Sequence, residues 1–296
     1  MFPVLFSVGK ISVSSFGVFL ALGFLLGIFL IWRLTRAWDL NEEKILDLIL
    51  LTFIGGLFAS RIYFALENWQ YFMASPLNLF LINKSPGFSF WGGFLGGWLT
   101  LYAFARRKRL DFWQLADIAF VGLLGGLVLS QLGCFLGGCN IGIPSKAFFS
   151  VTMVGFVGKR WPIQAVEAVF LSIGLLKIWS QATHFHQRGK IAATGLILVG
   201  AAKLILEPLK QDHSEVIFPV FFILLGTVIL YKVTKQNPIT QFKKLVAYLE
   251  KLISDPKVRK TAIQSFSKLW YNQKTNIGWK LRNVKKSIRR SNVKFS

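Results

Sequence analysis

Two ionisable residues, Lys203 and Glu207, interrupt an apolar stretch near residue 200. Their four-residue spacing places both side chains on the same face of a helix. An ionisable group at membrane depth is costly and usually faces a partner or a polar cavity. The two side chains therefore either neutralise each other or serve a reaction, in which the ammonium attracts a phosphate and one of the two groups accepts a proton.

Other polar residues occur at comparable depth. Arg61 follows a long apolar run, where it is either a snorkelling arginine or a functional cation. Asp117 opens another apolar stretch, and we expect it to cap its own helix. We predict that six polar side chains converge in one pocket in the outer half of the bilayer: Arg61, Gln131, Gln164, Glu167, Lys203 and Glu207.

Two segments, residues 87–97 and 125–142, are rich in glycine. Glycine at this density serves either close helix packing or a backbone that approaches a lipid headgroup. The second segment holds the only two cysteines, Cys134 and Cys139, which either form a disulfide outside the membrane or remain packed thiols. We favour the thiols. Their spacing matches no zinc motif, and the sequence has no nucleotide-binding fingerprint, so we expect neither a metal nor a cofactor.

The elements that must hold these residues are membrane spans. Hydrophobic residues make up 53% of the chain and charged residues 16%, against about 25% charged in an average soluble domain. Apolar stretches of roughly 17–25 residues are long enough to cross a bilayer as helices. The sequence predicts an all-α, polytopic membrane protein with about seven transmembrane helices, near residues 13–33, 46–66, 88–105, 117–137, 163–180, 191–209 and 215–233.

The charges of the connecting loops alternate along the chain. The first, third and fifth loops and the tail are basic, and residues 106–109 alone carry four consecutive cations. Cytoplasmic loops of membrane proteins carry the excess of Lys and Arg. We therefore expect the N-terminus outside and the C-terminus in the cytoplasm, with the long loops 67–87 and 138–162 facing outward.

The C-terminal segment differs in composition from the rest of the chain. We divide the chain into a transmembrane domain, residues 1–233, and a basic amphipathic cytoplasmic tail, residues 234–296. The tail holds 16 Lys or Arg against two acidic residues, with Phe242 and Leu245 among apolar residues at helical spacing. We predict that it lies on anionic lipid rather than on nucleic acid, which is the rival interpretation of such a charge.

Six short motifs follow one another between residues 6 and 212. They are Ser15-Phe16-Gly17, Ser60-Arg61-Ile62, Phe88 to Gly93, Gln131 to Gly142, Trp161 to Glu167, and Lys203 to Glu207 with Lys210. Their order, with apolar spans between them, resembles the bacterial prolipoprotein diacylglyceryl transferases. The basic tail lies outside this resemblance.

The resemblance implies a multi-pass enzyme of the bacterial plasma (inner) membrane. It would move diacylglyceryl from phosphatidylglycerol to the thiol of the lipobox cysteine of a preprolipoprotein, and glycerol phosphate would leave. Lys203 and Glu207 would then be the catalytic residues. The resemblance assigns phospholipid binding to eight further positions: Arg61, Gln131, Gln164, Glu167, Lys210, Gly92, Gly93 and Gly133.

The chain departs from the family pattern where the chemistry is expected. Trp91 stands where the family has a histidine, and Gln131 where it has an arginine. Cys134 replaces an asparagine and Phe16 a tyrosine, and Lys203 and Lys210 replace arginines. These changes fit either an active transferase with a rearranged site or a non-catalytic homologue that binds lipid or lipoprotein; a channel or carrier is the third alternative. We favour the active transferase, because a buried Lys203–Glu207 pair is costly to keep without use.

Overall fold

A computed structural model describes residues 4–8, 11–79, 81, 87–153, 155–211, 216–235, 254–256 and 264. The chain divides into two compact units, residues 1–235 and 236–296. The predicted amphipathic tail and its apolar residues lie almost entirely outside the described residues. The first unit carries every other feature considered below.

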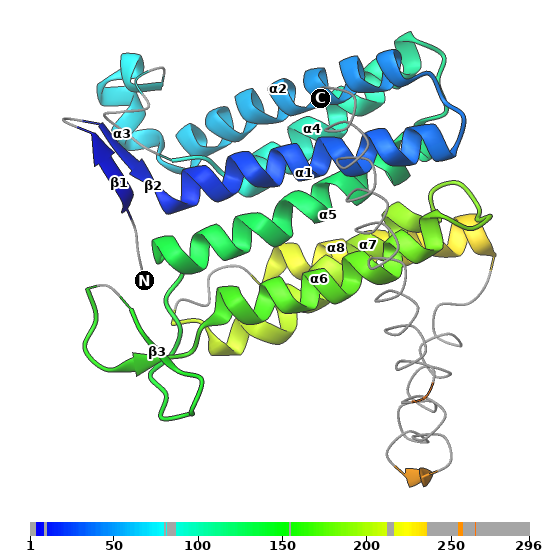
Figure 1. Cartoon of the computed structure of the whole chain (residues 1–296). Coiled ribbons are helices and arrows are strands. Elements are labelled where there is room, and N and C mark those ends of the chain that lie inside the picture. The colour runs from blue at the N-terminus through cyan, green and yellow to red at the C-terminus, as the bar shows by residue number, and fades with distance from the viewer. Residues whose placement is uncertain are drawn as a thin grey trace, which may run out of the picture. The chain divides into compact units, whose positions relative to one another are not determined.

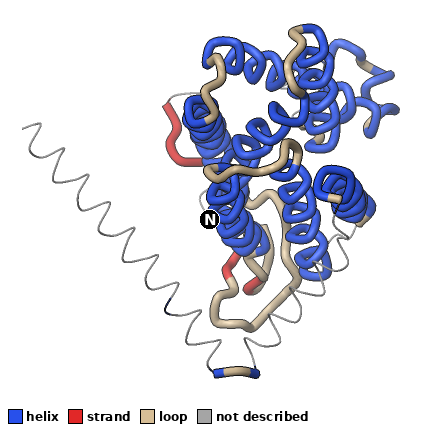
Figure 2. Tube along the Cα trace, turned by 90° about the vertical axis from the view of Figure 1, so that its right-hand side faces the viewer, coloured by secondary structure: helices blue, strands red, loops and turns tan. Residues whose placement is uncertain are grey.

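Long helices make up nearly all of the first unit (Figures 1 and 2). Seven of them are present among the described residues: α1 Ser15–Ala37, α2 Glu42–Glu67, α4 Phe90–Arg107, α5 Phe112–Gly137, α6 Ile163–Ala182, α7 Lys190–Leu206 and α8 Ile217–Thr234. The shorter elements are α3 Trp69–Ala74, η1 Pro76–Leu79, η2 Glu207–Leu209, and the strands β1 Val4–Val8, β2 Ile11–Ser14, β3 Val151–Thr152 and β4 Lys159–Arg160. β1 pairs with β2 and β3 with β4, both antiparallel.

Six helices within the described residues are long and apolar enough to cross a membrane, and α4 is the long helix outside that set. α4 has 18 residues, among them four glycines and a terminal Arg106-Arg107 pair, which lower its mean hydropathy. Large apolar side chains on the spans are more than half exposed, including Leu25, Phe58, Ile173 and Leu224. Such a surface suits lipid rather than water. The all-α, polytopic class is confirmed, while the count of seven spans stays a prediction.

The long helices run alongside one another, so their connections gather at two ends (Figure 1). One end holds the turns after α1, α4 and α6, residues 38–41, 108–111 and 183–189, and we call it the basic end. Arg188 and Asp111 join two of these turns through an ion pair with a 2.6 Å N–O distance. The other end holds α3 and the strands, and we call it the loop end. The alternation of loop charge in the sequence therefore corresponds to two physical ends.

Polar residues fix where the helices begin. Asp111 caps α5 by accepting hydrogen bonds from the backbone of Trp113 and Gln114. The prediction that Asp117 caps its own helix is wrong, because α5 begins five residues earlier. The fully buried Asp117 carboxylate instead accepts from the backbone N–H groups of Gly189 and Ala192, both at 2.7 Å. It therefore caps α7, whose first-turn donors have no partner within their own helix.

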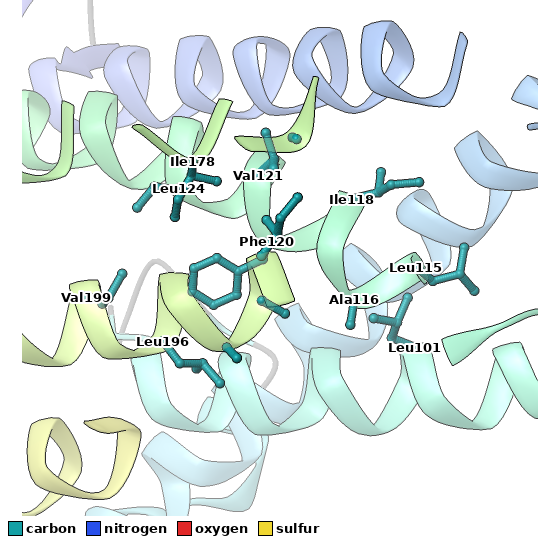
Figure 3. Packing of buried hydrophobic residues seen from close by; sticks show 14 of the residues in the cluster. Leu101, Leu115, Ala116, Ile118, Phe120, Val121, Leu124, Ile178, Leu196 and Val199 are labelled. Carbon is teal, nitrogen blue, oxygen red and sulfur yellow. The ribbon is translucent and has the colours of Figure 1, made fainter. Parts of the chain in front are cut away.

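The buried core lies along α5, which packs against α1, α6 and α7. Phe120 of α5 points toward Leu196 and Val199 of α7 (Figure 3). On the α1 side, glycines allow backbone contact: a Cβ on Gly23 would lie 2.9 Å from the carbonyl oxygen of Gly126. Small residues at such a contact give helices close approach inside a membrane, where apolar burial alone gives little driving force.

Aromatic rings join the α2–α4 pair to α8. Trp91 of α4 stacks on Phe218 of α8 with ring centroids 4.2 Å apart, and Phe222 lies 5.0 Å away. Phe94 contacts Phe222 at 4.6 Å. Stacked and edge-on ring pairs of this kind add about 0.5–1.5 kcal/mol each beyond the area that they bury. This aromatic cluster fixes α4 beside α8.

Candidate functional site

Buried ion pairs lie where α6, α7 and η2 meet. The Lys203 ammonium is 3.2 Å from the Glu167 carboxylate, and both side chains are largely buried. The Lys210 ammonium is 2.7 Å from the Glu207 carboxylate. Buried charges of this kind stay ionised only when they are paired, since isolated ions pay a large desolvation cost. The pairs place two cations and two potential proton acceptors in one region.

The predicted pairing of Lys203 with Glu207 is wrong. Lys203 forms its ion pair across to α6, at Glu167. The regular helix ends at Leu206, and Glu207 begins a short 3-10 turn that contains Pro208. The Glu207 carboxylate is paired with Lys210, three residues later. Four-residue spacing permits a contact within a helix, but a partner on a neighbouring helix competes for the same charge.

The segment 139–143, at the end of the Gln131 to Gly142 motif, is held against η2. We call it the signature segment. Ile143 donates its backbone N–H to the Leu209 carbonyl, and Gln211 donates to the Ile141 carbonyl, both at 3.0 Å. The Gln164 side-chain amide, fully buried, donates to the Asn140 carbonyl. These bonds bring the signature segment beside Lys210. Residues that are far apart in the sequence therefore form one polar region.

Arg160 adds to these contacts between the 139–143 segment and η2, although its sequence marks it only as part of the 138–162 loop. Its Nη1 donates to the Gly142 carbonyl at 3.0 Å and to the Gln211 side chain at 2.7 Å. Gly142 has room for no side chain, because a Cβ would lie 2.2 Å from the Trp161 carbonyl oxygen. The signal that could have identified Arg160 is its position directly before the Trp161-Pro162 motif.

The preference for packed thiols at Cys134 and Cys139 is wrong. The two residues form a disulfide, with Cα atoms 5.0 Å apart. Helix α5 ends at Gly137, and Gly138 adopts a left-handed conformation with φ of 77°. This turn folds the chain back so that residue 139 reaches residue 134. A spacing of five within a continuous helix would not bring the two Cβ atoms to bonding distance, so the helix end decides the pairing.

We expect the disulfide to stabilise the signature segment. Closing a loop this short contributes about 2 kcal/mol in the chain-entropy account. The double variant Cys134→Ser, Cys139→Ser should therefore unfold at a lower temperature than the wild type in detergent. A reductant should shift the wild-type transition in the same direction and leave the double variant unchanged. Equal transitions for the wild type with and without reductant, after mass spectrometry has verified reduction, would contradict this expectation.

Trp91 occupies the family's histidine position, and its surroundings are apolar. The ring is buried in the aromatic cluster with Phe218 and Phe222. Its neighbour Phe90 lies near the polar region, with its ring 5.5 Å from the Lys203 ammonium. An indole has no basic nitrogen and donates only. The position therefore serves packing, and Trp91 is unsuited to accepting a proton.

Arg61 binds the chain between α2 and α4. Its Nε donates to the Leu79 carbonyl, Nη1 to the Gly87 carbonyl and Nη2 to the Asn78 carbonyl, at 2.8–2.9 Å. These contacts fix the chain between α2 and α4 against the end of α2. Neither the snorkelling interpretation nor a place in the shared pocket describes these contacts. Backbone carbonyls already use much of the donor capacity of the guanidinium.

The remaining predicted positions contribute packing and neutral polar groups. Gly92 and Gly93 lie against α2, where added Cβ atoms would be 2.3 Å from Tyr63 and 3.2 Å from Ser60. Gly133 lies against α1, 2.6 Å from the Cβ of Phe19 by the same measure. Close helix packing therefore describes these glycines. The side-chain oxygen of Gln131 is buried and has no hydrogen-bond partner among the described residues.

Four of the six polar residues are brought together, and the single pocket for all six stays a prediction. Lys203 and Glu167 meet directly, and Gln164 and Glu207 with Lys210 are linked through the 139–143 segment. Arg61 belongs to the chain between α2 and α4. The region that remains is capable of binding an anion through two ammonium groups and of accepting a proton through a carboxylate.

Sequence comparison matches most of the chain to known proteins. The family model described as prolipoprotein diacylglyceryl transferase matches residues 3–239. A phosphatidylglycerol–prolipoprotein diacylglyceryl transferase of Synechococcus elongatus is 28% identical over 260 residues, which cover 80% of this chain and 90% of that protein. The enzyme of the same name from Staphylococcus haemolyticus is 26% identical over 255 residues, with the same coverage. That from Deinococcus radiodurans is 34% identical over 171 residues, covering 56% of this chain and 48% of that protein. The chain belongs to the prolipoprotein diacylglyceryl transferase family.

Proposed function

We propose that this protein is a phosphatidylglycerol–prolipoprotein diacylglyceryl transferase. The observation that carries the proposal is the family match over residues 3–239, which includes all seven long helices and the buried ion pairs. The substrates are phosphatidylglycerol and the lipobox segment of a preprolipoprotein. Relatives covered over 90% of their own length carry this activity in their names.

The reaction requires two kinds of assistance. The cysteine thiol loses its proton, and its sulfur attacks the carbon of the diacylated glycerol that carries the phosphate ester. The carbon–sulfur bond forms, the carbon–oxygen bond breaks, and glycerol phosphate leaves with the electron pair. A base assists the first event, and fixed cations stabilise the charge that grows on the leaving group.

The buried ion pairs are suited to these roles. Lys203 and Lys210 supply the cations beside the leaving phosphate, and Glu207 is the proton acceptor. A lysine ammonium cannot bind a phosphate through two parallel N–H groups as an arginine guanidinium does. Two ammonium groups acting together therefore replace one guanidinium. Gln164 adds a neutral polar group in the same region. The buried amide of Gln131, on α5, is a further candidate for binding the phospholipid.

A direct assay tests the proposal. The purified protein is incubated with phosphatidylglycerol and a lipobox peptide, and mass spectrometry follows the peptide. The expected product carries diacylglyceryl on its cysteine sulfur. A matched peptide with serine in place of the cysteine should remain unmodified. Absence of thioether product with folded protein would contradict the proposal.

One observation favours a second candidate, a non-catalytic homologue that binds lipid or lipoprotein. Trp91 stands where the family pattern has a base, and it is buried among aromatic rings. In this alternative the fold is retained for binding, and the assay gives no product although the lipid still associates.

The chain is a multi-pass membrane protein. Its family membership and the six apolar helices among its described residues both support this class. We further propose the bacterial inner membrane, with the loop end outside and the basic end in the cytoplasm. Arg33, Arg36, Arg106 and Arg107 belong to the helix ends that gather at the basic end, which supports this orientation.

A labelling experiment checks the orientation. The two native cysteines are joined, so an added cysteine would be the only free thiol. The variant Ser296→Cys should be unreactive to an impermeant thiol reagent in intact cells and reactive after permeabilisation. The matched variant Phe148→Cys, at a fully exposed position of the loop end, should react in intact cells. The reverse pattern would overturn the orientation.

A further inference from the structure

A hollow of about 230 Å³ opens at the basic end, beside the turn between α6 and α7. Its polar lining comes from Ser180, Gln181, His184, His186 and Lys190. Helix α6 ends at Ala182 and α7 begins at Lys190, so the hollow lies where two spans leave the bilayer. It belongs to the opposite end of the molecule from the signature segment.

The two histidines of this hollow are held in place. His184 donates from Nδ1 to the Ser180 carbonyl at 2.6 Å, and His186 donates from Nδ1 to the His184 carbonyl at 2.8 Å. The Trp38 ring packs 5.0 Å from the His186 ring, and the indole N–H donates to the Ala182 carbonyl. The wall of the hollow is therefore formed by fixed groups rather than by a free loop.

The hollow carries basic groups on its wall. The buried Asp117 carboxylate, 3.7 Å from the Nε2 of His186, raises the pKa of that imidazole above its usual value. Within the described part of the chain, Lys190 has no ion-pair partner, whereas the neighbouring Arg188 is paired with Asp111. Lys190 therefore offers a cation that no side chain neutralises.

Two further features narrow the ligand class. Phe185, on the rim, is fully exposed, and an exposed ring at the end of two spans is suited to the lipid interface. The buried side-chain oxygen of Gln181 has no hydrogen-bond partner among the described residues, so it can accept from a hydroxyl. Phosphate, hydroxyl and an adjoining acyl region occur together in a phospholipid with a polyol headgroup.

We propose that this hollow binds the phosphate of an anionic phospholipid headgroup in the leaflet at the basic end, with Lys190 as its main cation and Phe185 in the adjoining acyl region. Free phosphate shares part of this chemistry, but it makes no use of the exposed ring. The site is separate from the ion pairs of the proposed transfer reaction. It therefore stands or falls independently of that reaction.

A local probe tests the site. The full-length variant Gln187→Cys, at an exposed position of the same turn that does not line the hollow, is labelled with a trifluoromethyl group at its single free thiol and placed in phosphatidylcholine nanodiscs. Increasing fractions of phosphatidylglycerol should shift the fluorine resonance to a plateau. Adding Lys190→Gln should raise the half-saturating fraction about fivefold, the equivalent of about 1 kcal/mol for one surface cation. Lys190→Arg should restore the wild-type value.

Lys108→Gln is the matched control, since it removes one lysine from another turn at the same end. It should leave the half-saturating fraction unchanged. An equal effect of both glutamine variants would overturn the site in favour of general surface attraction. A response to inorganic phosphate in pure phosphatidylcholine, with none to phosphatidylglycerol, would overturn the lipid assignment in favour of a free anion. Thermal denaturation of each variant verifies that the fold is retained.

Discussion

Lys203→Ala is expected to reduce transfer to an undetectable rate. The substitution removes a cation from beside the leaving phosphate, and loss of one preorganised group of this kind costs about 10²–10³ in rate. It also leaves the Glu167 carboxylate buried without its ammonium partner, which costs about 3–5 kcal/mol of stability. Transfer is measured by the thioether assay, and stability by thermal denaturation in the same detergent.

A second variant separates the two effects. Lys203→Met with Glu167→Gln removes both charges, so no uncompensated ion remains in the interior. This double variant should recover most of the lost stability and none of the transfer. The control is Lys177→Ala, an exposed lysine of α6, which should resemble the wild type in both measurements. A folded Lys203→Ala protein with the wild-type rate would remove Lys203 from the proposed site.

Trp91→His combined with Gln131→Arg is expected to lower transfer or leave it unchanged, although it restores two family residues. The indole is stacked between α4 and α8, and a smaller imidazole there loses contacts and leaves a void. The new guanidinium would replace a neutral, buried amide and bring a charge that needs a counter-ion. Both changes oppose the native packing.

The wild type and the double variant are compared for thioether yield at equal amounts of folded protein. Trp91→Phe is the matched control, since it keeps an aromatic ring and adds no base. A wild type without product that is rescued by the double variant, and not by Trp91→Phe, would contradict the expectation. That result would identify a degenerate enzyme with an intact scaffold.

The helices were predictable because the bilayer imposes one simple constraint on sequence. Runs of apolar residues and the basic residues between them predicted every long helix to within about five residues. The short strands were not predicted, since strands of two to five residues leave little periodic signal. A buried Asp117 that caps a different helix has the same local sequence as one that caps its own. Its true partners, Gly189 and Ala192, lie more than 70 residues away.

The buried ion pairs were predictable in which residues need partners and not in how those residues pair. The free-energy cost of an ionisable group within an apolar span identifies Glu167, Lys203 and Glu207 as residues that need partners. Which carboxylate meets which ammonium depends on how α6 and α7 are rotated against each other, and helical spacing alone does not contain that angle. Likewise, the disulfide depends on the left-handed turn at Gly138, which a continuous helix pattern conceals.

The capping of α7 by Asp117 has a consequence for how this helix tolerates length changes. The carboxylate fixes the position of the first turn of α7, so the positions of later residues depend on how many residues separate them from that turn. One residue inserted between this first turn and Lys203 would move that lysine by about 1.5 Å along the helix axis and rotate it by about 100° around the axis. The ammonium would then leave Glu167 and face a different neighbour. Deletions and insertions in α7 should therefore be far more damaging than equally apolar substitutions, because the number of residues between 189 and 203 sets which neighbour the Lys203 ammonium faces.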